Sequence, residues 1–249
     1  MIPFFTSDYS LGRSILKLKP TNGGPSDILT MAKEAELKEI FLVEDTMIGF
    51  LEAQNIFYEE GISLRFGARL NVCNDVEQDK KDSSFKIILF ALNDEGCKEL
   101  YNIFSEVHTH PNREGHLDLE ILKSCERGNI LAVHPFYDSY LFQNSFYFKN
   151  CMWVKMFDKE IYAWEDNKLP VDGVMRKNLS AYSENCEKVK TILYRHRSDV
   201  SAYQTYRMAC NRSFGKSRGL SAPNLEHFGS NEFCFQSYME EAHGRPFKI

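Results

Sequence analysis

The amino-acid sequence predicts an α/β fold with a largely parallel sheet. Up to residue 135, short apolar runs alternate with segments whose apolar residues recur at helical spacing. Hydrophobic residues make up 43% of the chain and charged residues 26%, which suits a packed globular core. No apolar run is long enough to span a bilayer, so we expect no membrane segment. Regular alternation of strands and helices usually builds a parallel sheet covered by helices.

The predicted elements follow one another in a regular order. Ser26 is a candidate helix cap, because apolar residues recur at helical spacing from there to Leu37. The apolar run Ile40–Val43 is then a short buried strand. Further strands are predicted over 65–72, 86–91 and 130–133, and further helices over 49–58, from Asn93 onward and over 117–125.

Beyond residue 136 the pattern is less regular. The segments are an aromatic-rich stretch over 136–148, a turn or linker over 168–173 and helices over 174–189 and 200–209. The C-terminal region contains several Gly and Pro residues, which favour loops. We therefore predict an α/β barrel domain over residues 1–210, followed by a C-terminal extension over 211–249 that is mostly loop.

Charge and cysteine usage limit the classes of function. Lys and Arg number 30 and Asp and Glu number 35, giving a formal net charge of -5. This balance excludes a whole-surface attraction to nucleic acid, although it permits a local basic patch. The 7 Cys residues form no C-x-x-C pair, which predicts reduced thiols rather than a zinc ribbon or a disulfide framework. Residues 1–8 lack the features of a signal peptide, so we expect a cytoplasmic protein.

Side chains that can bind metals lie at the ends of predicted strands. Glu44 and Asp45 follow one strand, and His134 ends another. Ligands in parallel α/β folds bind beyond the carboxyl ends of strands, so these residues are weak candidate metal ligands. The simpler interpretation of His134 is a capping or core histidine. The pair His108 and His110 is likewise explained more simply by a solvated helix end than by a metal site.

A basic segment lies near the C-terminus. It contains aromatic residues and a single acid, Asp199. Its cations are Arg195, Arg197, Arg207, Arg212, Lys216 and Arg218. Cations neutralise phosphates and aromatic rings stack on bases, so the segment is a candidate nucleic-acid contact. The alternative is a solvated helix face whose aromatic side is packed.

Several stretches of the chain, taken in order, carry a family resemblance. They are Ser7–Leu11, Leu42–Gly49, Gly61–Leu70 and Phe85–Leu100, with 199–207 and 225–235 near the end. They resemble the PHP domain of bacterial replicative DNA polymerase III alpha subunits and the stretch that follows it. The resemblance implies a distorted (β/α)7 barrel. It also implies a cleft at the strand ends, where active members hold up to three metal ions and hydrolyse phosphoesters.

The metal ligands of the family are mostly replaced in this chain. By the same resemblance, the ligand positions fall on Phe4, Thr6, Val43, Glu44, Arg69, Lys86, Thr191 and Leu193. Apolar side chains do not bind these metals, and cationic side chains repel them. We therefore expect no bound metal. Arg69 and Lys86 make the cleft more basic, suiting it to a phosphate or a partner's acidic side chain, unless they pair with Glu44 or Asp45.

Three functional hypotheses follow. The leading one is a stand-alone, non-catalytic PHP-type pseudoenzyme that acts as a binding or scaffolding component of DNA replication. Its partner would be a DNA polymerase or another replication protein. It would come from a phage or mobile element, or be one piece of a split polymerase. The second is a metal-dependent phosphoesterase or 3'→5' exonuclease using Mn, Zn or Mg at a reduced site around Asp8, Asp45 and His134. The third is a nucleic-acid binder acting through Arg195 to Arg218.

Overall fold

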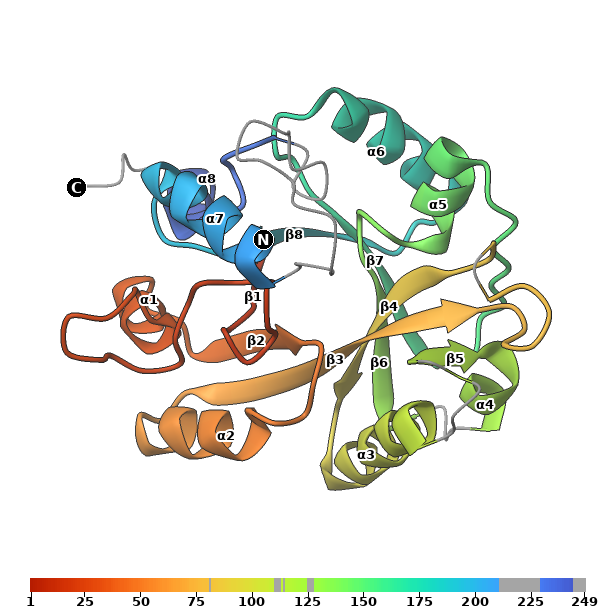
Figure 1. The fold of residues 1–249 in the computed structure, drawn as a ribbon, viewed down its shortest axis with the longest axis horizontal. Coiled ribbons are helices and arrows are strands. Elements are labelled where there is room, and N and C mark those ends of the chain that lie inside the picture. The colour runs from red at the N-terminus through yellow and green to blue at the C-terminus, as the bar shows by residue number, and fades with distance from the viewer. Residues whose placement is uncertain (81, 110–112, 114, 125–127, 211–228, 244–249) are drawn as a thin grey trace. The chain divides into compact units, whose positions relative to one another are not determined.

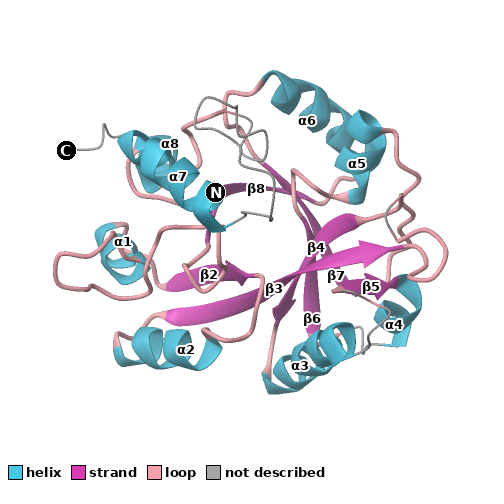
Figure 2. Ribbon diagram, viewed as in Figure 1, coloured by secondary structure: helices cyan, strands magenta, loops and turns pink. Residues whose placement is uncertain are grey.

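The computed structural model describes residues 1–80, 82–109, 113, 115–124, 128–210 and 229–243. The chain divides into two compact units. Unit 1 contains residues 1–64 and 165–172 and the described residues from 189 onward, and unit 2 contains residues 65–164 and 173–188. Figures 1 and 2 show their helices and strands. No helix in the described ranges is long and apolar enough to cross a membrane.

Unit 1 contains the first two strands and helices from both ends of the sequence. Its elements are β1 (Ile2–Phe5), α1 (Ile28–Glu34), β2 (Glu39–Glu44), α2 (Phe50–Glu59), the 3-10 helix η1 (Arg197–Asp199), α7 (Val200–Cys210) and α8 (Phe235–His243). Three further elements run from one unit into the other. These are β3 (Ser63–Cys73), α6 (Pro170–Tyr182) and β8 (Cys186–Ile192).

Unit 2 follows the predicted alternation of strands and helices. Its elements are β4 (Phe85–Ala91), α3 (Asp94–Thr109), β5 (His116–Asp118), α4 (Leu119–Ser124), β6 (Ile130–His134), α5 (Tyr140–Tyr147) and β7 (Lys159–Trp164). The strand β4 is almost entirely apolar, and its residues Ile87 to Phe90 are buried. Burial of both faces of such a strand is the main source of its stability.

The strands of the described chain form one hydrogen-bonded sheet. Their order is β2-β1-β8-β7-β6-β4-β3-β5, and β2 also pairs with β3, which closes seven strands into a barrel. β4 runs antiparallel to both β3 and β6, whereas the pairs of β1 with β2 and β8 and of β7 with β6 and β8 are parallel. The α/β prediction is therefore confirmed. Most of the strand pairs are parallel, as expected, and the two pairs of β4 make the sheet mixed.

The first helix begins one residue later than predicted. The N-cap is Asp27 rather than Ser26, because Asp27 Oδ1 accepts a hydrogen bond from the Thr30 N–H at 2.7 Å. A carboxylate at this position satisfies a backbone donor that has no partner within the helix. The predicted helix over 49–58 corresponds closely to α2, whose buried residues are Ala53, Ile56 and Phe57.

Three other boundary predictions are wrong. The stretch over 168–173 is not a linker, because Pro170 begins α6, where its missing N–H costs nothing. The helix predicted over 174–189 ends at Tyr182, and the chain then forms β8. The helix predicted from Leu117 begins at Leu119, after the short strand β5. The strands β1 and β7 were not predicted from residue patterns.

Candidate functional site

In unit 1, all but one of the positions that align with PHP-family metal ligands lie on one face of three neighbouring strands. Phe4 on β1 is opposite Phe41 on β2 and Thr191 on β8. Side chains alternate along a strand, so residues two positions further on share this face. The aligned positions on it are Phe4, Thr6, Val43, Thr191 and Leu193. This face therefore presents apolar and hydroxyl groups where the resemblance implies metal ligands.

In unit 2 the two aligned positions also share one face. Lys86 on β4 is opposite Asn71 on β3, and Arg69 lies two residues before Asn71. Both side chains are half-buried. Two cations on one strand pair oppose the binding of a metal ion by Coulomb repulsion.

Glu44 is the only aligned position of the chain that keeps a carboxylate, and it points to the other face of β2. Leu42 is opposite Phe5, so Glu44 shares the face of these two residues and not that of Phe4. Its side chain is fully buried. One carboxylate oxygen accepts the Ser7 N–H at 2.9 Å, and the other accepts the Ser10 hydroxyl. The structure therefore uses Glu44 to hold the turn after β1.

Two other carboxylates of unit 1, those of Asp8 and Asp45, form ion pairs within this unit. Asp8 pairs with Lys17, and Asp45 Oδ2 lies 3.0 Å from Arg13 Nε. The Asp45 N–H also donates to Ser10 Oγ at 2.7 Å. These contacts give both carboxylates cationic partners within their own unit, and each pair is partly exposed.

A buried carboxylate adjoins one of the aligned positions. Glu165 follows β7 and accepts the Thr191 hydroxyl at 2.7 Å and the Thr191 N–H at 3.1 Å. It also accepts the Asn167 side-chain amide at 2.9 Å. Burial raises the pKa of Glu165, in spite of these donors and of nearby Lys190. The Thr191 hydroxyl is therefore engaged within unit 1.

His134 lies in an aromatic cluster on the opposite face from Lys86. Val133 is opposite Ile88, which shares the face of Lys86, so the next residue, His134, points the other way. The imidazole stacks on Tyr162, with ring centroids 4.4 Å apart. The other rings around it are Trp153 at 4.7 Å and Tyr140 at 5.4 Å. This is a core position, which matches the simpler interpretation of the sequence.

The polar neighbour of His134 is Glu160. Glu160 Oε2 lies 3.5 Å from His134 Nε2, which is too long for a hydrogen bond. Burial lowers the pKa of His134, and the nearby carboxylate opposes this shift only in part. Burial by itself would raise the pKa of Glu160. His134 and the N–H donors of Phe157, Trp153 and Met156 outweigh burial and lower it.

The described residues hold no group of three or more His, Cys, Asp or Glu side chains placed to bind a metal ion. Asp8, Glu44 and Asp45 belong to unit 1 and His134 to unit 2. His108 lies in the last turn of α3, where its Nδ1 is 2.8 Å from the Phe104 carbonyl oxygen. His110 lies outside the described residues. The expectation that no metal binds stays a prediction.

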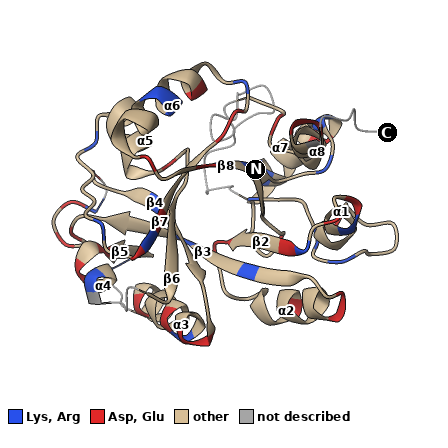
Figure 3. Ribbon diagram, turned by 180° about the vertical axis from the view of Figure 1, so that it is seen from behind, with Lys and Arg blue, Asp and Glu red and all other residues tan. Residues whose placement is uncertain are grey.

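The described arginines of the basic segment contact residues of their own unit. Arg195 lies 2.6 Å from Glu34, and Arg197 lies 2.8 Å from Glu232 and 2.7 Å from Glu240. Arg207 is buried and donates to the Tyr203 hydroxyl at 2.8 Å. Arg212, Lys216 and Arg218 lie outside the described residues. These contacts offer little support for a nucleic-acid surface at the three described arginines. Along the described part of the ribbon, acidic and basic residues are interspersed (Figure 3).

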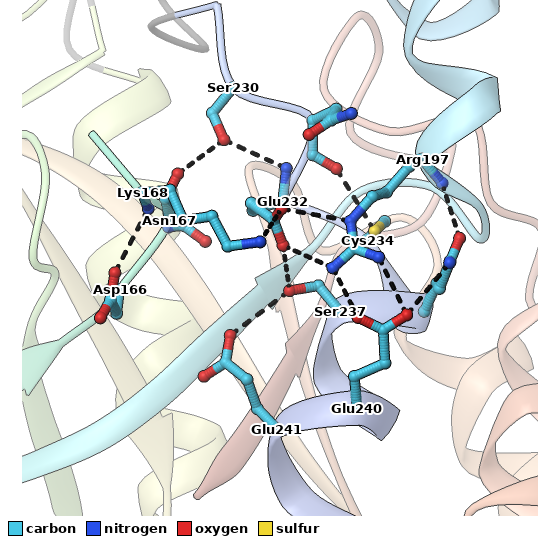
Figure 4. Close-up of polar contacts among 12 residues, drawn as sticks. Asp166, Asn167, Lys168, Arg197, Ser230, Glu232, Cys234, Ser237, Glu240 and Glu241 are labelled. Atoms are coloured by element: carbon cyan, nitrogen blue, oxygen red, sulfur yellow. Dashed lines mark hydrogen bonds and ion pairs between the residues drawn. The ribbon is translucent and has the colours of Figure 1, made fainter. Parts of the chain in front are cut away.

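The sequence analysis missed a network of polar contacts that fixes residues 230–241 (Figure 4). Glu232 binds Arg197, the Lys168 ammonium at 2.7 Å and the Ser237 hydroxyl at 2.6 Å. Burial would raise the pKa of Glu232, but these partners lower it to about 2. No local spacing in the sequence indicates the network, because its members come from three distant stretches.

A fully buried lysine extends this network. Lys190 on β8 donates to Glu241 Oε1 at 2.7 Å and to the Asp166 carbonyl oxygen at 3.2 Å. The Ser237 hydroxyl lies between Glu232 and Glu241 and contacts both. The network therefore joins β8, the residues after β7 and α8 through charged hydrogen bonds, which are stronger than neutral ones.

Comparisons with known proteins give no family assignment. No protein-family model matches the chain, and no curated protein matches it. The class of protein defined by the structure is thus an α/β protein with a closed mixed barrel. The strand-end carboxylates of its unit 1 are engaged by side chains and backbone of that unit.

Proposed function

We propose that this chain is a PHP-type barrel protein that binds rather than cleaves, acting as a scaffolding component of DNA replication. The observation that carries the proposal is the environment of Glu44. This carboxylate stands at an aligned ligand position, yet it is buried and accepts hydrogen bonds from Ser7 and Ser10. A buried carboxylate with a hydrogen bond to each oxygen fits a structural role better than metal binding.

The strand register supports the comparison with the PHP family. Ligands that share a metal cluster must come from one face of the strands. The aligned positions other than Glu44 do share one face within each unit, as described above. The residues there are apolar, hydroxyl-bearing or cationic. Phosphoester hydrolysis by metal ions needs His and carboxylate ligands at these positions, so the arrangement favours a binding role.

The first experiment measures metal content and hydrolysis. The protein is purified without chelator and offered manganese, zinc or magnesium. We expect well below one equivalent of bound metal and no metal-dependent cleavage of a phosphodiester or of single-stranded DNA, because several convergent ligands are required. Tightly bound metal and hydrolysis abolished by Asp45→Ala would establish the phosphoesterase hypothesis instead.

The second experiment tests the replication partner. The chain is co-expressed with the replicative DNA polymerase of the same genome, and the mixture is separated by size-exclusion chromatography. We expect the two proteins to elute together. Separate elution would contradict the replication role. Salt-dependent binding to DNA, lost in the Arg207→Ala and Arg212→Ala variants, would favour the nucleic-acid hypothesis.

A further inference from the structure

Residues 147–155 of unit 2, which we term the edge segment, expose an unusual number of large apolar side chains. The exposed fractions are 59% for Tyr147, 91% for Phe148, 53% for Met152 and 64% for Val154. Single exposed apolar residues are normal on a protein surface. Four within one short stretch form a patch of the kind that marks an interaction site.

The backbone at Phe148 strengthens this interpretation. Phe148 follows α5 with φ 54° and ψ 34°, in the left-handed region that disfavours side chains other than glycine. This conformation costs about 1 kcal/mol for an L-residue. The Phe148 ring is almost fully exposed, so its own burial does not offset the cost. The conformation ends α5, where the Phe148 N–H donates to the Gln143 carbonyl oxygen, and it leaves the phenyl ring exposed to solvent.

The first part of the edge segment is fixed by side-chain amides. Asn144 on α5 accepts the Cys151 N–H at 2.8 Å and donates to the Cys151 carbonyl oxygen at 2.9 Å. Asn74 accepts the Met152 N–H at 2.8 Å. The Trp153 indole N–H donates to Glu160 at 3.1 Å, which anchors the next residue. The segment is therefore held in place up to Trp153.

The second part of the segment has backbone groups available for pairing. The main-chain N–H and C=O groups of Trp153, Val154 and Lys155 make no hydrogen bond to any described residue. Burial alternates over residues 151–154, since Cys151 is buried and Trp153 half-buried while Met152 and Val154 are exposed. A fixed segment with unpaired backbone groups offers pairing positions to an added strand.

Charge indicates which occupant fits. Residues 147–157 contain Lys149 and Lys155 and no acidic residue, and the first acid is Asp158. Lys155 is exposed and makes no ion pair with a described residue. A second copy of the chain, paired symmetrically, would bring these cations together, and facing like charges are destabilising. An acidic partner segment would instead be attracted.

We propose that the edge segment binds an extended stretch of a partner protein as an added β-strand. That stretch would have apolar side chains at alternate positions and acidic residues beside them. The apolar side chains contact Phe148, Met152 and Val154, and the backbone pairs with residues 153–155. The inference rests on the proposed scaffolding function, and deepens it by locating the surface that a partner contacts.

Selection from a library of short random peptides displayed on phage tests the proposal. We expect the selected peptides to be acidic with alternating apolar residues. Synthetic peptides should bind about tenfold more weakly to a variant carrying Phe148→Ser and Met152→Ser, because interface energy concentrates in a few buried anchors. Leu11→Ser and Leu51→Ser remove exposed apolar residues of unit 1 and serve as matched controls that bind normally.

A proline substitution tests the mode of binding. Val154→Pro removes an N–H that has no partner among the described residues, so circular dichroism and thermal unfolding should match those of the wild type. Peptide binding should still weaken about tenfold, because the added strand loses a backbone hydrogen bond and meets the proline ring. Equal binding to wild type and Val154→Pro would overturn strand addition.

Other outcomes also overturn the proposal. These are selected peptides that are basic, binding that survives the Phe148→Ser and Met152→Ser changes, the absence of any selected peptide, or a wild-type dimer that these changes abolish in analytical ultracentrifugation.

The experiments distinguish a failure of this proposal from a failure of the replication role. A polymerase complex that forms equally well with the double variant leaves the replication role intact and removes this surface. Peptide binding without a polymerase complex supports this surface and contradicts the replication role.

Discussion

Lys190 in unit 1 and His134 in unit 2 are both buried basic groups, with side-chain exposures of 0% and 1%, yet their surroundings differ. Lys190 lies 2.7 Å from a carboxylate oxygen of Glu241 and also contacts a backbone carbonyl. The His134 imidazole is surrounded by aromatic rings, and its nitrogens have no hydrogen-bond partner in the part of the chain that the structure describes.

The difference shows two ways in which a protein interior accommodates a basic side chain. A lysine keeps its charge when an acid and a carbonyl replace the water that it loses. A histidine can instead lose its proton near neutral pH, and burial favours that outcome. Unit 1 therefore depends on paired charges at this position, whereas unit 2 depends on aromatic packing around a neutral ring.

Removing the partner of Lys190 should give the largest effect. Glu241→Gln leaves a fully buried ammonium without its carboxylate and should lower the free energy of unfolding by about 3 kcal/mol. Lys190→Met should cost less, because Glu241 is partly exposed and can be hydrated. Urea denaturation measures both. Lys177→Ala, an exposed lysine on α6, is the control. Equal effects of Glu241→Gln and Lys190→Met would contradict this account.

Removing a neutral donor from the buried Glu44 carboxylate should give the second largest loss of stability. Ser10→Ala removes a hydroxyl that donates to Glu44 and accepts the Asp45 N–H. Loss of a hydrogen bond to a buried charge costs about 2 kcal/mol. Urea denaturation should show this loss for Ser10→Ala and almost none for Ser201→Ala, an exposed serine on α7. Similar stability of both variants would show that Glu44 does not depend on this hydroxyl.

Acid should act on unit 2 through His134. The pKa of folded His134 lies below its ordinary value of 6.5, so below that pH the unfolded chain binds a proton that the folded chain does not. The contribution of His134 to the free energy of unfolding is therefore complete above pH 6.5. As the pH falls, it decreases by at most about 1.4 kcal/mol for each pH unit. Urea midpoints measured between pH 7.5 and 5.5 should fall less steeply for His134→Phe than for wild type.

Glu160 does not contribute to the pH dependence measured between pH 7.5 and 5.5. Its pKa lies below the ordinary value of 4.5, so its stabilising contribution is present above that pH and is lost only in more acidic solution. An unchanged pH slope in His134→Phe would show that the imidazole does not set the acid sensitivity of the chain between these two values.

A single neutral hydrogen bond should give the smallest effect. The Tyr140 and Tyr162 hydroxyl oxygens are 2.9 Å apart in the aromatic cluster, and both side chains are buried. Tyr140→Phe should cost about 1 kcal/mol, since one buried hydrogen bond is lost while the ring packing remains. Tyr101→Phe, at an exposed position, is the matched control in thermal unfolding. A greater loss than for Ser10→Ala would reverse the ranking of charged and neutral contacts.

Local patterns predicted the strands and helices with a clear periodicity. The apolar runs at Ile40–Val43 and 86–91 lie within β2 and β4, and the strand–helix alternation gave the correct fold class. The helix predicted over 174–189 is too long because Cys186 and Val189 also fit helical spacing, whereas pairing with β1 and β7 makes this stretch the strand β8. The direction of β4 is set by pairing with β3 and β6, which no local pattern encodes.

The candidate site was predictable only in part. Sequence reasoning identified Glu44, Asp45 and His134 as strand-end residues, and all three lie there. It could not show that Glu44 points to the other face, since this depends on the register between β1 and β2. The Glu232 network escaped prediction for a related reason. Its contacts join residues as far apart as Lys168 and Glu232, which only the folded chain brings together.

The three separate stretches of unit 1 impose an order on its assembly during synthesis. Most of unit 2 is one continuous stretch, residues 65–164, and is made before β8 and α8 leave the ribosome. The segment after β1 makes one of its contacts only late in synthesis, because Ser14 donates to the Leu193 carbonyl oxygen 179 residues away. Until β8 emerges, the apolar strand β1 lacks one of its two neighbours. Nascent chains therefore carry an unpaired, aggregation-prone edge that synthesis of β8 removes.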